Sequence, residues 1–395
     1  QVEVEAVREI AGRMAEFHQT AERGDAVSEA GDPEKLRAFA LANFEETRGA
    51  AGEIFHPSLH RLVEQRTASD FDRWMPLLKR RVDEGRVVEG HGDLHARNIC
   101  LSDPIAIYDC LEFNRELRCG DTATENAFLV MDLCYRGHPD LAEAYLAGYI
   151  EASGDREQRD LMPLLVRYRL MVRAKVAAIA AGESELSQAK RRASLKSARR
   201  HFHRVAASLI EEREPWMILA CGLPGTGKST VFAELADQTG WQIFSSDRIR
   251  KELAGVPAEV ALPERAYAPE FSRKVYRELL NRAEGEVRRS EVVLIDANFR
   301  TRRERESARK SAEAAGARLA IVHVETPEKE TRERLAERES LESSESDATA
   351  AVYEKLKSQF EPPDAEEADR VIRVNGINSP EQTVSEILAE LNGET

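Results

Sequence analysis

Residues 222–229, Gly-Leu-Pro-Gly-Thr-Gly-Lys-Ser, constrain the fold of this chain more than any other segment. They match the phosphate-binding pattern G-x-x-x-x-G-K-[ST] at every fixed position. An apolar run at 217–221 predicts a strand before the loop, and residues 229–239 predict a helix that Gly240 ends. A strand, a loop and a helix in this order indicate an open α/β domain. The alternative is an ordinary glycine-rich turn.

The same loop predicts a nucleoside triphosphate site. Its backbone N–H groups should converge on the phosphates, Lys228 should reach the β- and γ-phosphates, and the Ser229 hydroxyl should bind Mg²⁺. ATP is the expected nucleotide, with GTP as the alternative. The predicted nucleotide-binding residues are Gly222, Pro224, Gly225, Thr226, Gly227, Lys228, Ser229 and Thr230.

Residues downstream of the loop favour a kinase. A strand predicted at 242–245 delivers Asp247 and Arg250 to the carboxyl edge of the sheet, where open α/β folds bind ligands. Asp247 is suited to accept the proton of an attacking hydroxyl, and Arg250 to hold a phosphate or carboxylate of the acceptor. Alternatively, Asp247 caps a helix that starts at Arg248.

Two later segments complete the predicted site. The apolar run 292–296 predicts a buried strand that delivers Asp296 to the Mg²⁺ ion. After a strand predicted at 319–324, Arg334 and Arg338 lie four residues apart, so they share one helical face and could close over the phosphates. A solvated Arg/Glu helix explains them equally well. A last strand is expected at 370–374 and a closing helix at 380–391.

Together, residues 222–229, Asp247, Arg250, Asp296 and the Arg334/Arg338 pair resemble the P-loop kinases that include polynucleotide 5′-kinases, gluconate kinase-like proteins and zeta toxins. The resemblance covers the chain from Pro215 onward. It implies that Asp247 is the acceptor-hydroxyl base and that Arg250 contacts the acceptor. The identity of the acceptor does not follow from the fold.

A second constellation lies at 91–98, His-Gly-Asp-Leu-His-Ala-Arg-Asn, and is followed by Asp109. Asp93 would be a catalytic base, with Asn98 and Asp109 as metal ligands, on a loop bracketed by strands at 87–89, 99–101 and 105–108. A competing hypothesis is a metal site of His91, Asp93 and His95. It leaves Asn98 and Asp109 unexplained, and zinc is not expected.

This second motif resembles the catalytic loop of aminoglycoside phosphotransferases and related small-molecule kinases. Amphipathic helices are predicted at 4–18 and 34–46, and two more within 57–84. The region therefore resembles the C-terminal lobe alone, and we expect either a fragment or the loss of the β-rich lobe, with a crippled site. The whole chain resembles a class of bifunctional bacterial proteins that fuse two phosphotransferase modules.

The expected fold is α/β, with a mostly helical kinase-like C-lobe followed by a three-layer α/β/α P-loop domain with a parallel sheet. The predicted domains are residues 1–212 and 213–395, joined by a helical connection at 186–212. The basic residues of that connection, 190–200, are interpreted as a solvated helix face rather than a nucleic-acid contact.

Composition narrows the function. The net charge is −14, which argues against general nucleic-acid or membrane binding and favours a small hydroxyl acceptor over a 5′-hydroxyl nucleic acid. Five cysteines without C-x-x-C pairing, and the lack of a long apolar run, suggest a cytoplasmic protein. The sequence thus predicts an ATP- and Mg²⁺-dependent kinase. The alternatives are a nucleotide sensor with slow hydrolysis and a polynucleotide 5′-hydroxyl kinase.

Overall fold

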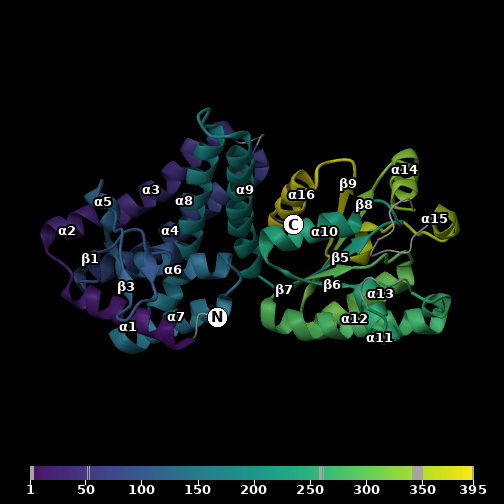
Figure 1. Ribbon diagram of the computed structural model, residues 1–395, viewed down its shortest axis with the longest axis horizontal. Coiled ribbons are helices and arrows are strands. Elements are labelled where there is room, and N and C mark those ends of the chain that lie inside the picture. Colours follow the sequence, from purple (N-terminus) through teal and green to yellow (C-terminus); the bar gives the residue numbers. More distant parts are fainter. Residues whose placement is uncertain are drawn as a thin grey trace. The chain divides into compact units, whose positions relative to one another are not determined.

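The computed structural model describes residues 4–50, 52, 54–257, 260, 262–339 and 350–393. The chain divides into two compact units, Gln1–Val205 and Ala206–Thr395, each with its own hydrophobic core (Figure 1). None of the helices in the described part combines the length and the hydropathy that crossing a membrane requires.

The first unit is mostly helical. Helix α6 is buried along most of its length and packs against α7 and α8, while α1 packs against α7. The helices are α1 (Val4–Thr20), α2 (Asp25–Ala30), α3 (Pro33–Thr47), α4 (Pro57–Asp83), α5 (Arg115–Arg118), α6 (Thr122–Tyr135), α7 (Pro139–Ser153), α8 (Gln158–Gly182) and α9 (Gln188–Glu211), with 3₁₀ turns η1 (Arg48–Ala50) and η2 (Ala96–Asn98).

Short antiparallel strands of the first unit frame the 91–98 loop. β1 (Val87–Glu89) pairs with β4 (Cys119–Asp121), and β2 (Ile99–Cys100) pairs with β3 (Ala106–Ile107). The three strands predicted around this loop are therefore confirmed, although β2 and β3 are shorter than expected.

The prediction of two helices within 57–84 is wrong, because α4 is one continuous helix with Pro76 inside it. Its buried side chains, from Leu59 through Val63 and Phe71 to Leu78, follow one stripe on both sides of the proline. An internal proline costs about 3 kcal/mol, and the continuous burial of this stripe offsets that cost.

Helix α9 confirms the helical connection predicted at 186–212. Phe202, Val205 and Leu209 are buried as expected, whereas Ala189 and Ala193 are exposed. The boundary between the compact units lies inside this helix, between Val205 and Ala206, whereas the sequence predicts a boundary after residue 212.

The second unit is built on a five-stranded parallel sheet with the order β6-β7-β5-β8-β9. The central strands β5 and β7 are buried at every position, which explains their continuous apolar sequences. The strands are β5 (Trp216–Cys221), β6 (Gln242–Ser245), β7 (Val292–Asp296), β8 (Arg318–Glu325) and β9 (Arg370–Asn375), all close to their predicted positions.

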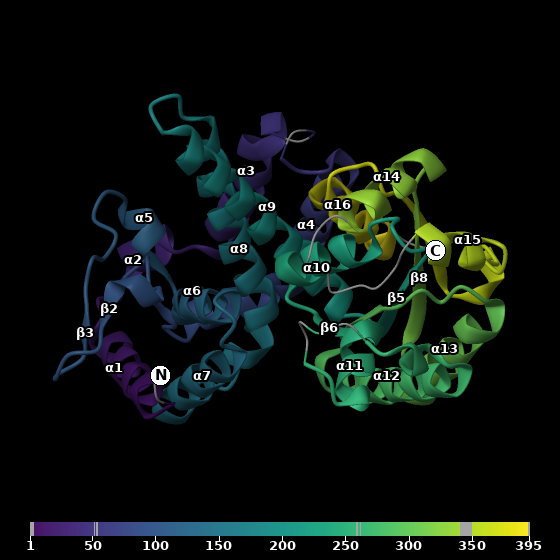
Figure 2. The same ribbon diagram turned by 45° about the vertical axis from the view of Figure 1, so that its right-hand side comes forward.

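Helices cover both faces of this sheet, so the predicted three-layer α/β/α fold is confirmed. Figures 1 and 2 show α10 and α16 on one face and α11, α12 and α13 on the other. The helices are α10 (Lys228–Thr239), α11 (Ser246–Ala254), α12 (Pro269–Ser290), α13 (Arg302–Ala315), α14 (Glu328–Glu339), α15 (Ala350–Lys357) and α16 (Pro380–Asn392), with 3₁₀ turns η3 (Glu264–Tyr267) and η4 (Ala365–Glu367).

Candidate functional site

The phosphate-binding loop connects β5 to α10. Gly225 has φ +81°, and a Cβ atom there would lie 2.9 Å from Cγ of Leu335. Only glycine combines that left-handed backbone with so close an approach of α14. Gly227 is the N-cap of α10, so the helix and its N–H groups begin at Lys228. This is the strand, loop and helix arrangement that the sequence predicted.

Lys228, Ser229 and Asp296 come together at the carboxyl edge of the sheet. Lys228 is 6 % exposed, and its Nζ donates a hydrogen bond to the carbonyl oxygen of Leu223 at 2.8 Å. Asp296 ends β7 and is 8 % exposed. Burial raises the pKa of Asp296, against the opposing effects of a hydrogen bond with Ser229 and the charge of Lys228.

These residues fit Mg²⁺ by their chemistry. A hydroxyl and a carboxylate are hard oxygen donors, and Mg²⁺ in kinases usually takes one or two protein oxygens together with phosphate oxygens and waters. The described residues contain no group of three or more His, Cys, Asp and Glu side chains that could hold a metal by themselves. A magnesium ion here would therefore depend on the nucleotide phosphates for further ligands.

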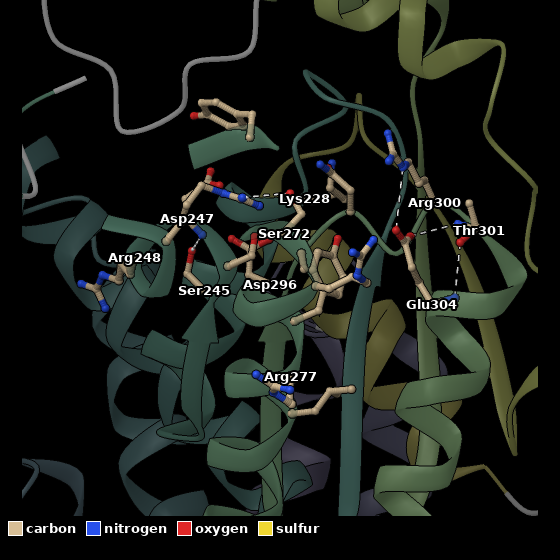
Figure 3. A pocket seen from close by; sticks show the side chains of 18 of the residues that line it. Lys228, Ser245, Asp247, Arg248, Ser272, Arg277, Asp296, Arg300, Thr301 and Glu304 are labelled. Atoms are coloured by element: carbon tan, nitrogen blue, oxygen red, sulfur yellow. Dashed lines mark hydrogen bonds and ion pairs between the residues drawn. The ribbon is translucent and has the colours of Figure 1, made fainter. Parts of the chain in front are cut away.

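Asp247 lies in the first turn of α11 and lines the same cleft as Lys228 and Asp296 (Figure 3). The alternative interpretation, in which Asp247 caps this helix, is wrong. Ser245 is the N-cap, and its Oγ accepts a hydrogen bond from the backbone N–H of Asp247 at 3.3 Å. The Asp247 carboxylate is thus not needed for capping.

Arg250 is 6 % exposed and also lines this cleft. Its guanidinium donates to the carbonyl oxygen of Ala266 at 2.8 Å and to Oγ of Ser272 at 3.2 Å, and it lies 5.1 Å from the centroid of the Tyr267 ring. Within the described part of the chain, its Nε has no hydrogen-bond partner and the guanidinium forms no ion pair with a carboxylate. A buried cation in this state is suited to an anionic ligand.

The cleft has a volume of about 2050 Å³ and extends beyond the predicted residues. In Figure 3, Asp247, Lys228 and Asp296 form one group, with Arg300, Thr301 and Glu304 to one side and Arg277 apart from them. Sequence reasoning missed the contributions of Ser272 and Arg277. They lie in a mixed polar helix with no motif, so no local signal could have identified them.

Two segments that follow β8 and β9 hold the phosphate-binding loop in place. Oγ1 of Thr326, after β8, donates to the carbonyl oxygen of Thr226 at 2.9 Å. A Cβ atom on Gly376, after β9, would lie 2.3 Å from that same oxygen, so only glycine fits there. Nη2 of Arg334 donates to the carbonyl oxygen of Gly376 at 2.8 Å, which places Arg334 beside the loop. The side chain of Arg338 is outside the described residues.

The segment after β7 is fixed by a buried ion pair. Arg305 is fully buried and donates to both carboxylate oxygens of Glu367, at 2.8 and 3.0 Å, and to the carbonyl oxygen of Phe299 at 2.9 Å. The neighbouring carbonyl of Asn298 accepts a hydrogen bond from the N–H of Gly222 at 3.3 Å. The ion pair therefore supports the backbone that follows Asp296, and this backbone is hydrogen-bonded to the phosphate-binding loop.

In the first unit, a buried network holds the 91–98 loop. Glu125 of α6 accepts a hydrogen bond from the N–H of Gly92 at 2.6 Å and pairs with Nε2 of His18 at 2.7 Å. Nδ1 of His18 lies 2.7 Å from the hydroxyl of Tyr149. No local pattern in the sequence indicates this support, because its members come from three separate helices.

The β2–β3 hairpin brings Asn98 and Asp109 toward Asp93. Nδ2 of Asn98 donates to the carbonyl oxygen of Asp93 at 3.0 Å, to its Oδ2 at 3.3 Å and to the carbonyl oxygen of Asp109 at 3.5 Å. Burial opposes ionisation of Asp93, but His95 at 3.4 Å, with help from nearby arginines, outweighs it and lowers the pKa of Asp93.

His91 has a structural role in this unit. One ring nitrogen, Nε2, bonds with the carbonyl oxygen of Tyr108 at 2.8 Å, and Nδ1 accepts from the N–H of Asp93 at 3.3 Å. Both nitrogens are therefore engaged with backbone groups. This arrangement gives no support to the competing metal site of His91, Asp93 and His95.

Comparison with known proteins gives two family matches. Residues 1–162 match the model of the phosphotransferase enzyme family, and residues 217–363 match the model of an AAA domain. The chain thus carries a region that matches the phosphotransferase enzyme family, followed by a P-loop domain that matches the AAA model, which confirms the resemblances seen in the sequence. Both matches support nucleotide binding and phosphotransferase activity in general.

Relatives extend beyond the matched region. Uncharacterized proteins of Mycobacterium tuberculosis and Mycobacterium bovis are 32% identical over 312 residues, which are 78% of this chain and 61% of theirs. The chain thus matches less than two thirds of the length of these relatives.

One similar solved structure is a sugar kinase of Janibacter sp., at 19% identity and a TM-score of 0.33 over 45% of this chain and 94% of that one. Another is a gluconokinase of Sinorhizobium meliloti, at 23% identity and a TM-score of 0.31 over 45% of this chain and 93% of that one. The APS kinase of Mycobacterium tuberculosis is similar at 19% identity, with a TM-score of 0.34 over 46% of this chain and 99% of that one.

Proposed function

We propose that the domain predicted at 213–395 is an ATP- and Mg²⁺-dependent kinase that transfers the γ-phosphoryl group to a hydroxyl acceptor. The observation that carries this proposal is that Lys228, Ser229, Asp296 and Asp247 line one cleft. The first three are the groups that bind nucleotide phosphates and their metal, and the fourth is a carboxylate that the helix cap does not use.

Each residue has a defined task in the transfer. The loop N–H groups and Lys228 bind the β- and γ-phosphates, and Arg250 offers its buried guanidinium to an anionic part of the acceptor. Mg²⁺, held by Ser229 and through Asp296, would neutralise the phosphate charge. As the acceptor oxygen bonds to the γ-phosphorus, the bond to the β,γ-bridging oxygen breaks and ADP leaves. Asp247 takes the proton of the acceptor hydroxyl.

Arg334 assists on the nucleotide side in this proposal, because its guanidinium already lies beside the phosphate-binding loop. The same role is proposed for Arg338, which is one helical turn further along α14.

We also propose a second kinase-like site in the first unit, of doubtful activity. Asp93 would be its base, with Asn98 and Asp109 as magnesium ligands. The supporting observation is that the Asn98 side chain donates hydrogen bonds to both aspartates. One goes to the Asp93 carboxylate and the other to the backbone carbonyl oxygen of Asp109. Oxygen donors of these types suit Mg²⁺.

The test is transfer of labelled γ-phosphate from ATP to pools of sugars, aminoglycosides, nucleosides and 5′-hydroxyl oligonucleotides. We expect one pool to be labelled, with activity lost in Lys228→Ala and in Asp247→Asn but kept in Asp93→Ala. Asp247→Asn should retain ATP affinity, because its role begins at the transfer step. ATP binding without labelling of any pool would instead favour the nucleotide sensor.

A further inference from the structure

We propose that the acceptor is a small molecule carrying a phosphate or carboxylate group apart from its reacting hydroxyl, and that Arg277 and Arg303 bind this anionic group. The inference rests on the proposed function and deepens it by naming a substrate class.

The cleft is cationic in an acidic protein. Ten lysines and arginines line it against five aspartates and glutamates, although the whole chain has a net charge of −14. A concave surface lined by one sign of charge focuses the field and concentrates ligands of the opposite sign. The net charge of the cleft lining is therefore positive, whereas that of the whole chain is negative. This difference favours anionic ligands in the cleft.

The acidic side chains on the acceptor side of the cleft are already engaged. Glu252 forms an ion pair with Arg282, which does not line the cleft, at 2.7 Å. Glu284 accepts a hydrogen bond from Ser311, and Glu304 accepts one from the backbone N–H of Thr301 in a capping box. Glu304 also forms an ion pair with Arg300 at 3.8 Å, and within the described residues none of these three carboxylates pairs with Arg277 or Arg303.

Arg277 of α12 and Arg303 of α13 are two cations of the cleft that remain available to a ligand. Both are exposed at the cleft, and within the described residues neither side chain has a hydrogen bond or an ion pair. Their helices pack against each other. A guanidinium presents a planar fork of donors that matches a phosphate or carboxylate, so the two arginines suit a shared anion.

This anion is distinct from the nucleotide phosphates. The nucleotide phosphates belong at the start of α10, with Lys228, and Figure 3 shows Arg277 apart from Lys228 and Asp296. A volume of about 2050 Å³ exceeds the roughly 300–1,000 Å³ of a site for one small ligand, so it accommodates a nucleotide and an acceptor together. The negative charge of the whole chain opposes a long polyanion and favours the small acceptor.

The test measures binding rather than turnover, with the full chain saturated by Mg²⁺ and a non-hydrolysable ATP analogue. Calorimetry compares ribose 5-phosphate with ribose, gluconate with glucose, and both pairs with a 5′-hydroxyl octanucleotide. The variant is Arg277→Gln/Arg303→Gln. The matched control is Lys274→Gln/Arg302→Gln, which removes the same charge from exposed positions of the same two helices outside the cleft.

We expect an anionic sugar to bind about tenfold more tightly than its neutral partner, and the cleft double variant to lose most of that preference, with Arg250 left to hold the rest. The control should keep it, and affinity for the ATP analogue should not change in either. Equal binding of neutral and anionic partners, or equal effects of the two double variants, would overturn the proposal. So would an octanucleotide that binds more tightly than both anionic sugars, with a steep salt dependence.

The two proposals fail separately. Binding of an anionic sugar through Arg277 and Arg303 without transfer of labelled phosphate to any pool would refute the kinase and leave the anion site standing. Transfer to a neutral acceptor, unaffected by the cleft double variant, would refute the anion site and leave the kinase standing.

Discussion

Replacing Arg305 by methionine tests whether the buried ion pair holds the segment after β7. The substitution keeps most of the side-chain volume and removes both hydrogen bonds to Glu367 and the one to the Phe299 carbonyl. The carboxylate of Glu367, which is 8 % exposed, is then left without its cation. Breaking a buried pair in this way costs about 3–5 kcal/mol, which is a large part of the stability of a domain.

Urea unfolding followed by tryptophan fluorescence measures this cost. Trp216 and Trp241 are buried in the second unit, so a Trp74→Phe background makes the signal report that unit alone. Arg289→Met is the matched control, because Arg289 pairs with Glu286 at the surface and should cost less than about 1 kcal/mol.

The pH dependence gives the prediction a second readout. Burial favours the protonated form of Glu367, but Arg305 outweighs burial and lowers the pKa below its ordinary value of 4.5. The pair therefore stabilises the fold above about pH 4.5, and this stability is lost as the pH falls through the lowered pKa. In Arg305→Met the unpaired carboxyl of Glu367 should have a raised pKa. The difference in unfolding free energy between the wild type and the variant should therefore become smaller as the pH falls.

A double-mutant cycle with Glu367→Gln separates this interaction from packing. We expect the two single substitutions to be strongly non-additive at pH 7, because each removes the same interaction. A cost below about 1 kcal/mol for Arg305→Met at pH 7, or additive effects across the cycle, would show that the ion pair does not hold this segment.

Three further predictions concern single positions. Gly225→Ala should weaken ATP binding at least about tenfold, because its φ of +81° and the approach of Leu335 strain any side chain there; unchanged affinity in a fluorescent-nucleotide titration would contradict this. Burial lowers the pKa of His201 to about 4, so the wild-type fold should lose stability as the pH falls from 6.5 toward 4, by up to about 3 kcal/mol. Melting of His201→Phe should lack this part of the pH dependence. Cys221, whose pKa burial raises to about 11, should resist alkylation at pH 8 while exposed Cys100 reacts, as mass spectrometry of the intact protein can show.

Local sequence patterns were sufficient for the parts of the site that lie within a few residues of a strand end. The phosphate-binding loop, Asp296 and Asp247 each follow an apolar run, and parallel strands place such ends at one edge of the sheet. The sequence therefore predicted the three-layer fold and the strands that carry these residues.

The remaining features depend on contacts between distant residues. Arg305 and Glu367 are 62 positions apart, and nothing in the charged helix around Arg305 distinguishes it from its solvated neighbours. Ser245 and Asp247 are both residue types that cap helices, and only the three-dimensional structure shows that Ser245 is the N-cap of α11. The continuous α4 was missed because burial against the core decides whether a helix continues through a proline.

The support of the phosphate-binding loop by Thr326 and Gly376 has a consequence for synthesis of the protein on the ribosome. The loop itself emerges early, but the backbone that holds it belongs to the ends of β8 and β9, about 100 and 150 residues later. A nascent chain that has exposed β5, β7 and β8 still lacks Gly376. Cellular ATP should therefore stabilise the finished domain and give little help to its partly synthesised precursors, whose folding depends on the sheet core alone.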